Sequence, residues 1–288
     1  MLRVAHCSDL HLLSHDGARW LDLANKRWIG AMNLLSNRSR HYHVDAFDHM
    51  VDDMNAQGIE HVLCTGDVTN LALKQEFEFA RAKFDRLARG PEHVTVLPGN
   101  HDAYVEEGIE YFAKIFAPYH TSDPGWPPGF PIVRVRGELA LIGLTTSRAT
   151  SWFSAYGYVG DEQLARLREV LTDPRLAGKV RLVAIHHPPA GRRARNPIRG
   201  LHDHAAFAKV ITECGADLVV HGHEHRDMFE NIDGVKVIGV ASGTYFHDDP
   251  ERTGRYRLYE IEAGKIRSDL VRVWDREHNR FISVKSPI

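Results

Sequence analysis

Five short segments rich in His, Asp and Asn recur along the first 225 residues. They are Asp9-Leu10-His11, Gly66-Asp67, Gly99-Asn100-His101-Asp102, His186-His187 and Gly222-His223-Glu224-His225. Each follows a run with the composition of a buried β-strand, and open α/β sheets place their ligands at the carboxyl ends of such strands. Carboxylate, amide and imidazole donors together suit a pair of divalent ions such as Mn, Fe or Zn, and are too rich in nitrogen for Ca or Mg. The pattern therefore predicts a two-metal hydrolase.

The segments differ in how specific they are. An Asp-x-His at a strand end puts both side chains on one face, but such triplets also occur by chance. A Gly-Asp is equally typical of a cap or an Asx-turn. The Asn100-His101 pair is more informative, because an amide oxygen can bind a metal without adding negative charge and His101 would then face the substrate. His223 and His225 lie two apart, so each could serve one of two adjacent metals.

Strand-like and helix-like segments alternate through the first two thirds of the chain, which favours a partly parallel sheet covered by helices. Strands are expected at 2–8, 61–65, 94–97, 132–135, 139–144, 180–185 and 218–221, and helices at 45–57, 75–87, 161–171 and around 204–214. From residue 228 onward the pattern becomes all-β. Because no repeat, low-complexity tract or Pro/Ser-rich linker interrupts the chain, we expect one domain over residues 1–288.

Composition narrows the functional class. The hydrophobic content of 43% and the charged content of 26% are ordinary for a globular protein. A net charge of -2 gives no general attraction to nucleic acid, so none is expected as a partner. Three widely separated cysteines without a Cys-x-x-Cys exclude a disulfide framework. With neither a signal peptide nor a long apolar segment at hand, the expected location is the cytoplasm.

In this order, the five segments resemble the motifs of the calcineurin-like metallophosphoesterases. That family's pattern is Asp-x-His, Gly-Asp, Gly-Asn-His-Asp/Glu, His and Gly-His-x-His, and every element is present between residues 4 and 225. The β-rich tail also looks like the family's closing strands. The resemblance implies an α/β fold, a four-layer α/β/β/α sandwich of two mixed sheets, with a dinuclear metal site at the strand carboxyl ends.

The resemblance also implies a role for each residue. One metal would be held by Asp9, His11, Asp67 and His225, and the second by Asp67, Asn100, His186 and His223. His101 would assist the leaving group or steady the phosphoryl charge, Asp102 would orient His101, and His187 is an alternative ligand to His186. A metal pair about 3.5–4 Å apart would ionise a bridging water, and this metal-bridging hydroxide would attack phosphorus without a covalent intermediate.

Residues 12–43 separate the first strand from its expected helix and form an amphipathic, basic insertion that could cap the site. Its apolar residues Leu21, Ala24, Trp28, Met32 and Leu35 fall on one helical stripe, surrounded by Arg and Lys. Such a segment suits a lipidic substrate, or peripheral membrane contact through residues 19–40. The alternative is a helix packed on the core with a solvated basic face. Residues 26–33 also resemble an insertion of some lipid-A-type hydrolases in this superfamily.

The substrate class is narrowed by two departures from the protein phosphatases of the superfamily. Val68-Thr69-Asn70 and Asp102 stand where those enzymes carry Asp-Arg-Gly and Glu. We therefore expect a phosphodiesterase or pyrophosphatase acting on a small molecule, with a lipid-linked or nucleotide substrate such as UDP-diacylglucosamine. A cyclic-nucleotide phosphodiesterase is the alternative, and a non-catalytic scaffold is the alternative from another class.

Arginines near the motifs are candidates for holding phosphate, whose geometry a guanidinium matches. Arg148 is the residue expected to contact the substrate. The run of Arg192, Arg193 and Arg195 after the His pair is better explained by surface solubility.

Overall fold

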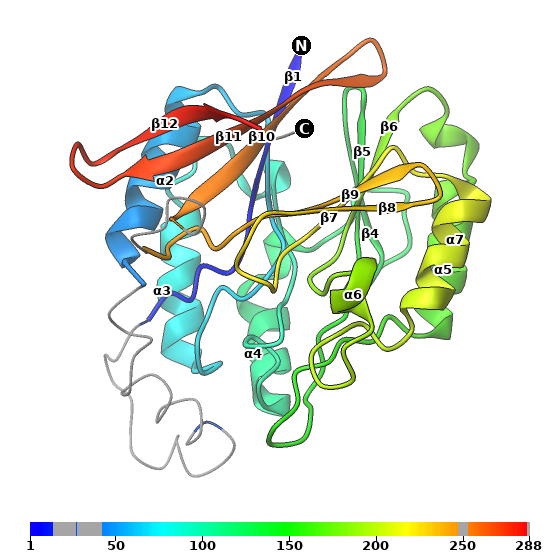
Figure 1. Ribbon diagram of the computed structural model, residues 1–288, viewed down its shortest axis with the longest axis horizontal. Coiled ribbons are helices and arrows are strands. Elements are labelled where there is room, and N and C mark those ends of the chain that lie inside the picture. The colour runs from blue at the N-terminus through cyan, green and yellow to red at the C-terminus, as the bar shows by residue number, and fades with distance from the viewer. Residues whose placement is uncertain (14–26, 28–41, 247–252, 287–288) are drawn as a thin grey trace.

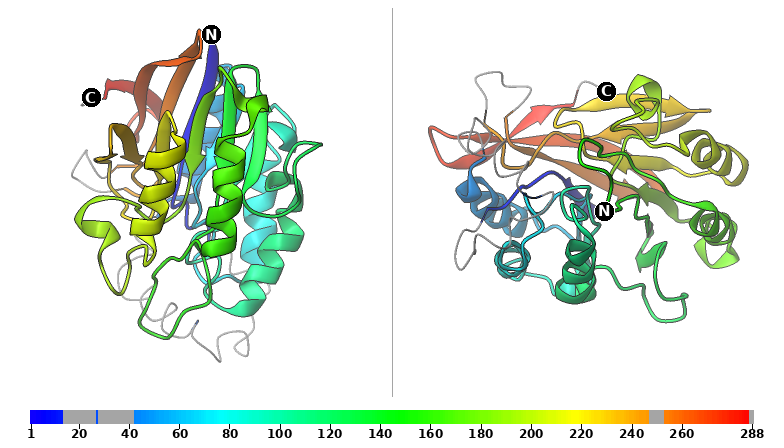
Figure 2. Two further views of the ribbon diagram at one scale, coloured as in Figure 1. Left: turned by 90° about the vertical axis from the view of Figure 1, so that its right-hand side faces the viewer. Right: turned by 90° about the horizontal axis from the view of Figure 1, so that it is seen from below.

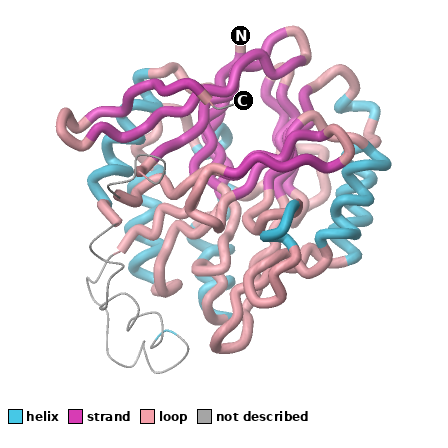
Figure 3. The backbone as a smooth tube through the Cα atoms, in the orientation of Figure 1, coloured by secondary structure: helices cyan, strands magenta, loops and turns pink. Residues whose placement is uncertain are grey.

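The computed structural model describes residues 1–13, 27, 42–246 and 253–286. Two six-stranded mixed sheets face each other, and helices cover the outer face of each, as the views along different axes in Figures 1 and 2 and the backbone tube in Figure 3 show. The predicted four-layer α/β/β/α sandwich is therefore confirmed.

The first sheet has the strand order β12-β11-β10-β1-β2-β3. Its strands are β1 (Leu2–Cys7), β2 (His61–Cys64), β3 (Val94–Val96), β10 (Arg255–Glu262), β11 (Lys265–Asp275) and β12 (Arg280–Lys285). Strands β1, β2 and β3 are parallel, while β10, β11 and β12 continue the sheet antiparallel. Helices α2 (Val44–Ala56), α3 (Lys74–Phe84) and α4 (Glu106–Ile115) accompany this sheet, and all three contribute to one core with it.

The second sheet has the order β4-β5-β6-β7-β9-β8. Its strands are β4 (Ile132–Arg136), β5 (Leu139–Gly143), β6 (Val180–Ala184), β7 (Leu218–His221), β8 (Met228–Ile232) and β9 (Val235–Gly239). Helices α5 (Asp161–Leu171) and α7 (His204–Cys214) pack on its outer face, and α6 (Gly191–Ala194) is a single turn after β6. Short 3₁₀ turns lie at η3 (Pro91–His93), η4 (Ala117–Tyr119) and η5 (Pro174–Leu176).

Strand β1 shows how the layers are held together. Leu2 and Val4 belong to the core between the two sheets, whereas Ala5 and Cys7 belong to the core beneath the helices. Successive strand residues point to opposite faces, so a strand buried on both sides must be apolar throughout. This double burial fixes the position of the strand's carboxyl end, from which Asp9 and His11 follow.

The expected strands agree with the structure within a residue or two, but two helices were missed, α4 and the single-turn α6. Helix α4 follows the Gly99-Asn100-His101-Asp102 segment and was not predicted. Cys7 and Cys64 are free and buried. Most of the 12–43 insertion lies outside the described residues. No helix in the described part of the chain is long and apolar enough to cross a membrane.

Candidate metal centre

The predicted ligands leave their strands through unusual backbone conformations. Asp9, His11, Asp67, His223 and His225 all have positive φ, between 45° and 73°. Non-glycine residues rarely adopt this left-handed region, and such conformations persist only where the surrounding structure enforces them. The strained turns lie at the exits of β1, β2 and β7, so each turns its side chain toward one shared edge of the sandwich.

Two glycines of the motifs are required by close packing. A Cβ on Gly99 would overlap the Asp67 carboxylate, and a Cβ on Gly222 would overlap the Ser8 hydroxyl. The glycines therefore let neighbouring strand exits approach until their polar side chains converge.

The first donor group brings together Asp9, His11, Asp67 and His225, whose ligand atoms all lie within 4.8 Å of one another. Nε2 of His11 is 3.1 Å from Nε2 of His225. Oδ1 of Asp9 is 3.3 Å from that same nitrogen of His225. Oδ2 of Asp67 is 3.9 Å from Nε2 of His11. These are the four residues predicted for the first metal.

A second donor group forms around Asn100. Its Oδ1 is 3.1 Å from Nε2 of His186 and 2.8 Å from Nδ1 of His223. Oδ2 of Asp67 is 3.5 Å from Nε2 of His186. One oxygen of Asp67 thus faces both groups, while its Oδ1 accepts a hydrogen bond from the backbone N–H of His101 at 2.7 Å. Oδ2 of Asp67 is therefore the oxygen placed to serve both sites.

The spacing of the donors fits a metal pair. Atoms bound to one ion at about 2.0–2.2 Å lie roughly 3–3.5 Å from each other. The separations of 2.8 Å to 3.9 Å among these nitrogens and oxygens are of that size. The mixture of carboxylate, amide and imidazole also matches the preferences of Mn, Fe and Zn.

Hydrogen bonds behind the imidazoles select their tautomers. Nδ1 of His186 donates to the backbone carbonyl of Thr65 at 2.7 Å, which leaves the Nε2 lone pair facing the centre. Nδ1 of His225 lies 3.0 Å from the hydroxyl of Tyr42. Such partners orient metal-binding histidines and are characteristic of metal sites. Tyr42 lies outside every sequence motif, so only the folded structure reveals it.

Burial favours the neutral, metal-binding form of two of the imidazoles. Desolvation lowers the pKa of His186, and it lowers the pKa of His223 well below the usual value. Burial alone would raise the pKa of Asp9, but the nearby His225 imidazole outweighs this and lowers that pKa to about 2. The centre therefore combines the ionised carboxylate of Asp9 with the neutral imidazoles of His186 and His223, the forms that bind metals.

His187 has both ring nitrogens engaged elsewhere. The hydroxyl of Thr146 donates to its Nδ1 at 2.7 Å, and its Nε2 donates to the carbonyl of Ala155 at 3.0 Å. His187 lies close enough to His186 and His223 to form a geometric cluster with them. Because binding a metal would break one of its two hydrogen bonds, His186 remains the better candidate.

His101 and Asp102 are arranged differently from the expectation. Nδ1 of His101 donates to the carbonyl of Asn70 at 2.7 Å. The Asp102 carboxylate instead accepts hydrogen bonds from the backbone N–H groups of Val68, Thr69 and Gly99 and from the Thr69 hydroxyl, at 2.8–3.2 Å. The prediction that Asp102 orients the His101 ring directly is therefore wrong. Asp102 joins the two ligand-bearing loops, and burial raises its pKa to about 6.

The candidate substrate residue Arg148 is exposed and stacks over the Tyr158 ring at 5.1 Å. None of its contacts among the described residues reaches the metal donors. Arg199 was not identified from the sequence, although its charge contributes to lowering the pKa of His223 and of His187. An isolated arginine carries no spacing signal, so only the folded position of Arg199 reveals this influence.

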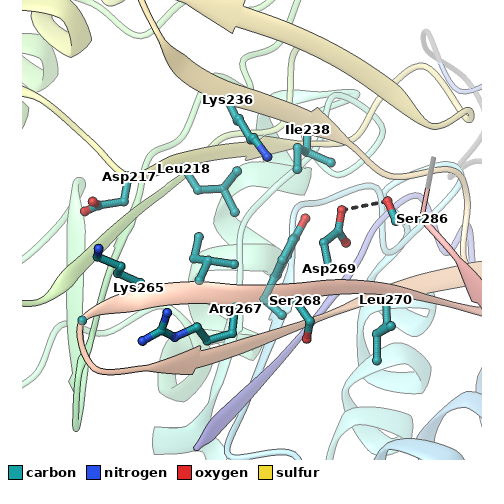
Figure 4. Close-up of a pocket in the computed structure, with 13 residues that line it drawn as sticks. Asp217, Leu218, Lys236, Ile238, Lys265, Arg267, Ser268, Asp269, Leu270 and Ser286 are labelled. Carbon is teal, nitrogen blue, oxygen red and sulfur yellow. Dashed lines mark hydrogen bonds between the residues drawn. The ribbon is translucent and has the colours of Figure 1, made fainter. Parts of the chain in front are cut away.

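A separate cavity of about 560 Å³ lies between the sheets, lined by residues of β7, β9, β10 and β11 (Figure 4). None of the predicted ligands lines it. Its two acids are already paired, because Asp217 accepts from the backbone N–H of Arg181 and Asp269 accepts from Ser286 and pairs with Arg257. This cavity is therefore distinct from the metal centre.

Two facing mixed sheets with two groups of metal donors at one edge define an α/β/β/α protein with a candidate binuclear metal centre. The chain belongs to the calcineurin-like phosphoesterase family, whose model matches residues 2–227. It is accordingly a metal-dependent phosphoesterase. A comparison with curated proteins gave no significant match.

Several solved structures share the fold. A dimetal phosphatase from Danio rerio is 14% identical, with a TM-score of 0.63 over 99% of this chain and 98% of that one. Purple acid phosphatase PPD1 of yellow lupin is 12% identical, with a TM-score of 0.59 over 98% of this chain and 52% of that one. The SoxB sulfate thiohydrolase of Thermus thermophilus is 16% identical, with a TM-score of 0.54 over 97% and 58% respectively. At these identities the likeness concerns the fold alone.

Proposed function

We propose that this chain hydrolyses a phosphodiester or pyrophosphate bond with two divalent ions, Mn, Fe or Zn, held by Asp9, His11, Asp67, Asn100, His186, His223 and His225. The observation that carries the proposal is the position of Asp67. Its Oδ2 lies 3.9 Å from a donor nitrogen of the first group and 3.5 Å from one of the second. A single carboxylate oxygen between two sets of converging lone pairs is the arrangement that a shared ligand needs.

When bound, the two ions would supply Lewis acidity and an activated water for in-line attack on phosphorus. The residues of the chain then have distinct tasks. Asn100 would complete the second site without adding negative charge. His101 is fixed by the Asn70 carbonyl through Nδ1, so its Nε2 would pass a proton to the leaving oxygen or stabilise the phosphoryl charge. Arg148, on the loop after β5, is proposed to contact the substrate phosphate.

The proposed substrate is lipid-linked, as in UDP-diacylglucosamine, and the anchoring of Arg27 supports this. Arg27 is 3% exposed and donates to the carbonyls of Leu71 at 2.9 Å and Ala72 at 2.8 Å. Leu71 is four residues from Asp67 in the chain, so Arg27 is bound to the loop that follows this predicted ligand. The amphipathic insertion to which Arg27 belongs could receive an acyl chain, or contact an anionic membrane through residues 19–40.

This proposal places the protein in the cytoplasm, peripheral to the inner face of the membrane, with no nucleic acid as partner. The leading alternative is a cyclic-nucleotide phosphodiesterase, for which a soluble substrate would leave the insertion a purely structural role. A non-catalytic scaffold is the alternative from another class. It is disfavoured because no predicted donor of either metal is missing from the two groups.

The test is turnover by Mn-loaded and metal-stripped protein on bis-p-nitrophenyl phosphate, cyclic AMP and UDP-diacylglucosamine. Metal-dependent hydrolysis of the lipid far above the other two is the expected result. Preference for cyclic AMP would favour the cyclic-nucleotide phosphodiesterase over the lipid-linked substrate, with the same two-metal chemistry. Two bound metals by elemental analysis with no turnover of any ester would favour the scaffold.

A further inference from the structure

Two loops beside the metal centre expose large apolar side chains to solvent. Phe153 is 83% exposed and Trp152 is 55% exposed on the loop between β5 and α5. Ile198 is 53% exposed on the loop between α6 and α7. Side chains of this size are seldom left so exposed close together, and where they are they commonly mark a contact surface.

The two loops form one unit. The carbonyl of Ile198 accepts hydrogen bonds from the backbone N–H of Ala155 at 2.9 Å and from the Ser154 hydroxyl at 3.2 Å. The backbone N–H of Gly157 donates to the carbonyl of Gly200 at 2.9 Å. Trp152, Phe153 and Ile198 therefore belong to one surface, formed by two loops that are hydrogen-bonded to each other.

The charge of these loops is one-sided. Residues 144–160 and 187–203 contain five arginines and one acid, in a chain whose net charge is -2. That acid, Asp203, accepts hydrogen bonds from the backbone N–H groups of Val159 and Gly160. Arg192, Arg195 and Arg199 are all exposed. We call Trp152, Phe153, Ile198, Arg192, Arg195 and Arg199 the aromatic–arginine surface.

The surface lies next to the metal centre. Ala155 holds the ring of His187, the direct neighbour of His186, at 3.0 Å. Arg193 of α6 pairs at 3.2 Å with Glu224, which stands between His223 and His225 in the chain.

From this juxtaposition we propose that the aromatic–arginine surface docks the protein on an anionic lipid bilayer, with the metal centre turned toward the membrane. Trp and Phe partition into the membrane–water interface, while arginines pair with lipid phosphates. Side chains exposed to this degree stand out from the surface and do not enclose a small ligand. A bilayer is a partner that accepts such protruding residues. The docking serves the lipid-linked substrate proposed above and in that respect rests on it.

The test is co-sedimentation of the full chain with phosphatidylcholine vesicles that contain or lack phosphatidylglycerol. Binding is expected only to the anionic vesicles and should weaken with salt. At about 1 kcal/mol per arginine, Arg192→Glu with Arg195→Glu should lower the partition coefficient by roughly thirtyfold or more. Trp152→Ser with Phe153→Ser should lower it by roughly tenfold or more, because the apolar burial is lost.

Two double variants at exposed residues away from this surface serve as controls. Ile282→Ser with Val284→Ser removes a smaller exposed apolar area from β12, and Lys236→Glu with Arg267→Glu makes the same change in charge near the separate cavity. Both controls should bind anionic vesicles like the wild type. An equal loss of vesicle binding in the controls would show that overall charge or stability causes the effect, and would overturn the proposal.

Other outcomes separate this proposal from the proposed function. Undiminished vesicle binding by the Trp152/Phe153 variant would assign docking to another segment and contradict the proposed role of the aromatic–arginine surface. A change of its oligomeric state without lipid would make the surface a contact between copies and equally overturn it. Hydrolysis of bis-p-nitrophenyl phosphate, a soluble ester, reports on the metal centre alone. Lost binding with retained hydrolysis by this variant supports docking, whereas absent hydrolysis in the wild type contradicts the function only.

Discussion

The carboxylate of Asp102 accepts two hydrogen bonds from Thr69, one from its backbone N–H at 2.9 Å and one from its hydroxyl at 2.8 Å. The two residues belong to loops that follow different strands, β2 and β3. Asp67 belongs to the first loop and Asn100 to the second, so this contact fixes the shared carboxylate relative to the amide of the second donor group. Asp102 thus acts as a positioning residue.

Replacing Asp102 by Asn, a side chain of nearly the same size, should disturb this contact between the two loops. An amide nitrogen would face backbone N–H donors that now meet Oδ2, leaving buried donors unpaired. We expect turnover to fall by about 10- to 100-fold, as for other residues that support metal ligands, together with weaker metal binding. Thr69→Val, which deletes only one hydroxyl, should have a smaller effect. Metal titration, kcat and thermal unfolding of both variants check this. Normal metal affinity with a lowered unfolding temperature would make the defect purely structural and contradict the positioning role.

Asp67→Ala should be the most damaging single change to metal content. Its Oδ2 is the only donor within 4 Å of both His11 and His186 among the described acids. Removing it takes a charged ligand from both sites, so elemental analysis should find less than one ion per chain. The exposed acid Asp52 offers a control, and its Ala variant should retain the metals of the wild type. Two tightly held ions in Asp67→Ala would contradict the shared-ligand assignment.

His101→Ala should separate proton transfer from metal binding. The ring is held by the Asn70 carbonyl, and it meets the His11 ring edge-on at 4.8 Å between centroids. If Nε2 serves the leaving group, kcat should fall by about 10²–10⁴-fold with both metals retained. The loss should be smaller for esters with a good leaving group, such as p-nitrophenolate, than for an alkyl ester. A fall in metal content would instead make His101 a ligand.

The motifs predicted the metal ligands better than they predicted the residues that contact and position those ligands. The carboxyl ends of neighbouring parallel strands meet at one edge of a sheet, so Asp9 and Asp67, which follow β1 and β2, could be brought together from the sequence alone. His186 follows β6 of the second sheet, and only the resemblance to the family placed it with them. The partner of Asp102 could not, because it lies 33 residues earlier and the contact depends on how two loops pack. Tyr42 and Arg199 were missed for the same reason. Their roles come from spatial neighbours and leave no local pattern.

Helix α4 was missed for a related reason. It begins after Val105 without a side-chain cap and contains Gly108, a residue that normally lowers helix propensity. A Cβ on Gly108 would come within 2.6 Å of the Asp102 carbonyl oxygen and 2.7 Å of the Ala72 Cβ. The glycine is therefore required by packing against the loops of the site, and that requirement is visible only in the folded structure.

His186 and His187 should differ sharply when each is replaced by Ala. Nε2 of His186 faces Asn100 and Asp67, whereas both nitrogens of His187 are engaged by Thr146 and Ala155. We expect His186→Ala to lose one ion, and His187→Ala to keep two while losing stability through the broken hydrogen bonds. Elemental analysis with thermal unfolding of both variants checks this. Loss of an ion from His187→Ala alone would make the second histidine the ligand.

Glu76 should give the metal-stripped protein a measurable pH dependence of stability. Burial raises the pKa of this carboxyl from 4.5 to about 7, although its Oε2 accepts hydrogen bonds from the backbone N–H groups of Leu71 and Leu73. Because the folded protein binds the proton more tightly, the stabilisation is complete below pH 4.5 and is lost as the pH rises through 7. The shift corresponds to up to about 3 kcal/mol in the free energy of unfolding. In urea unfolding between pH 5 and pH 8, the stability of the wild type relative to Glu76→Gln should therefore fall as the pH rises, because the buried histidines contribute equally to both proteins and cancel in the comparison. The exposed Glu78 supplies the control, and an equal difference between the wild type and Glu78→Gln would contradict the assignment to Glu76.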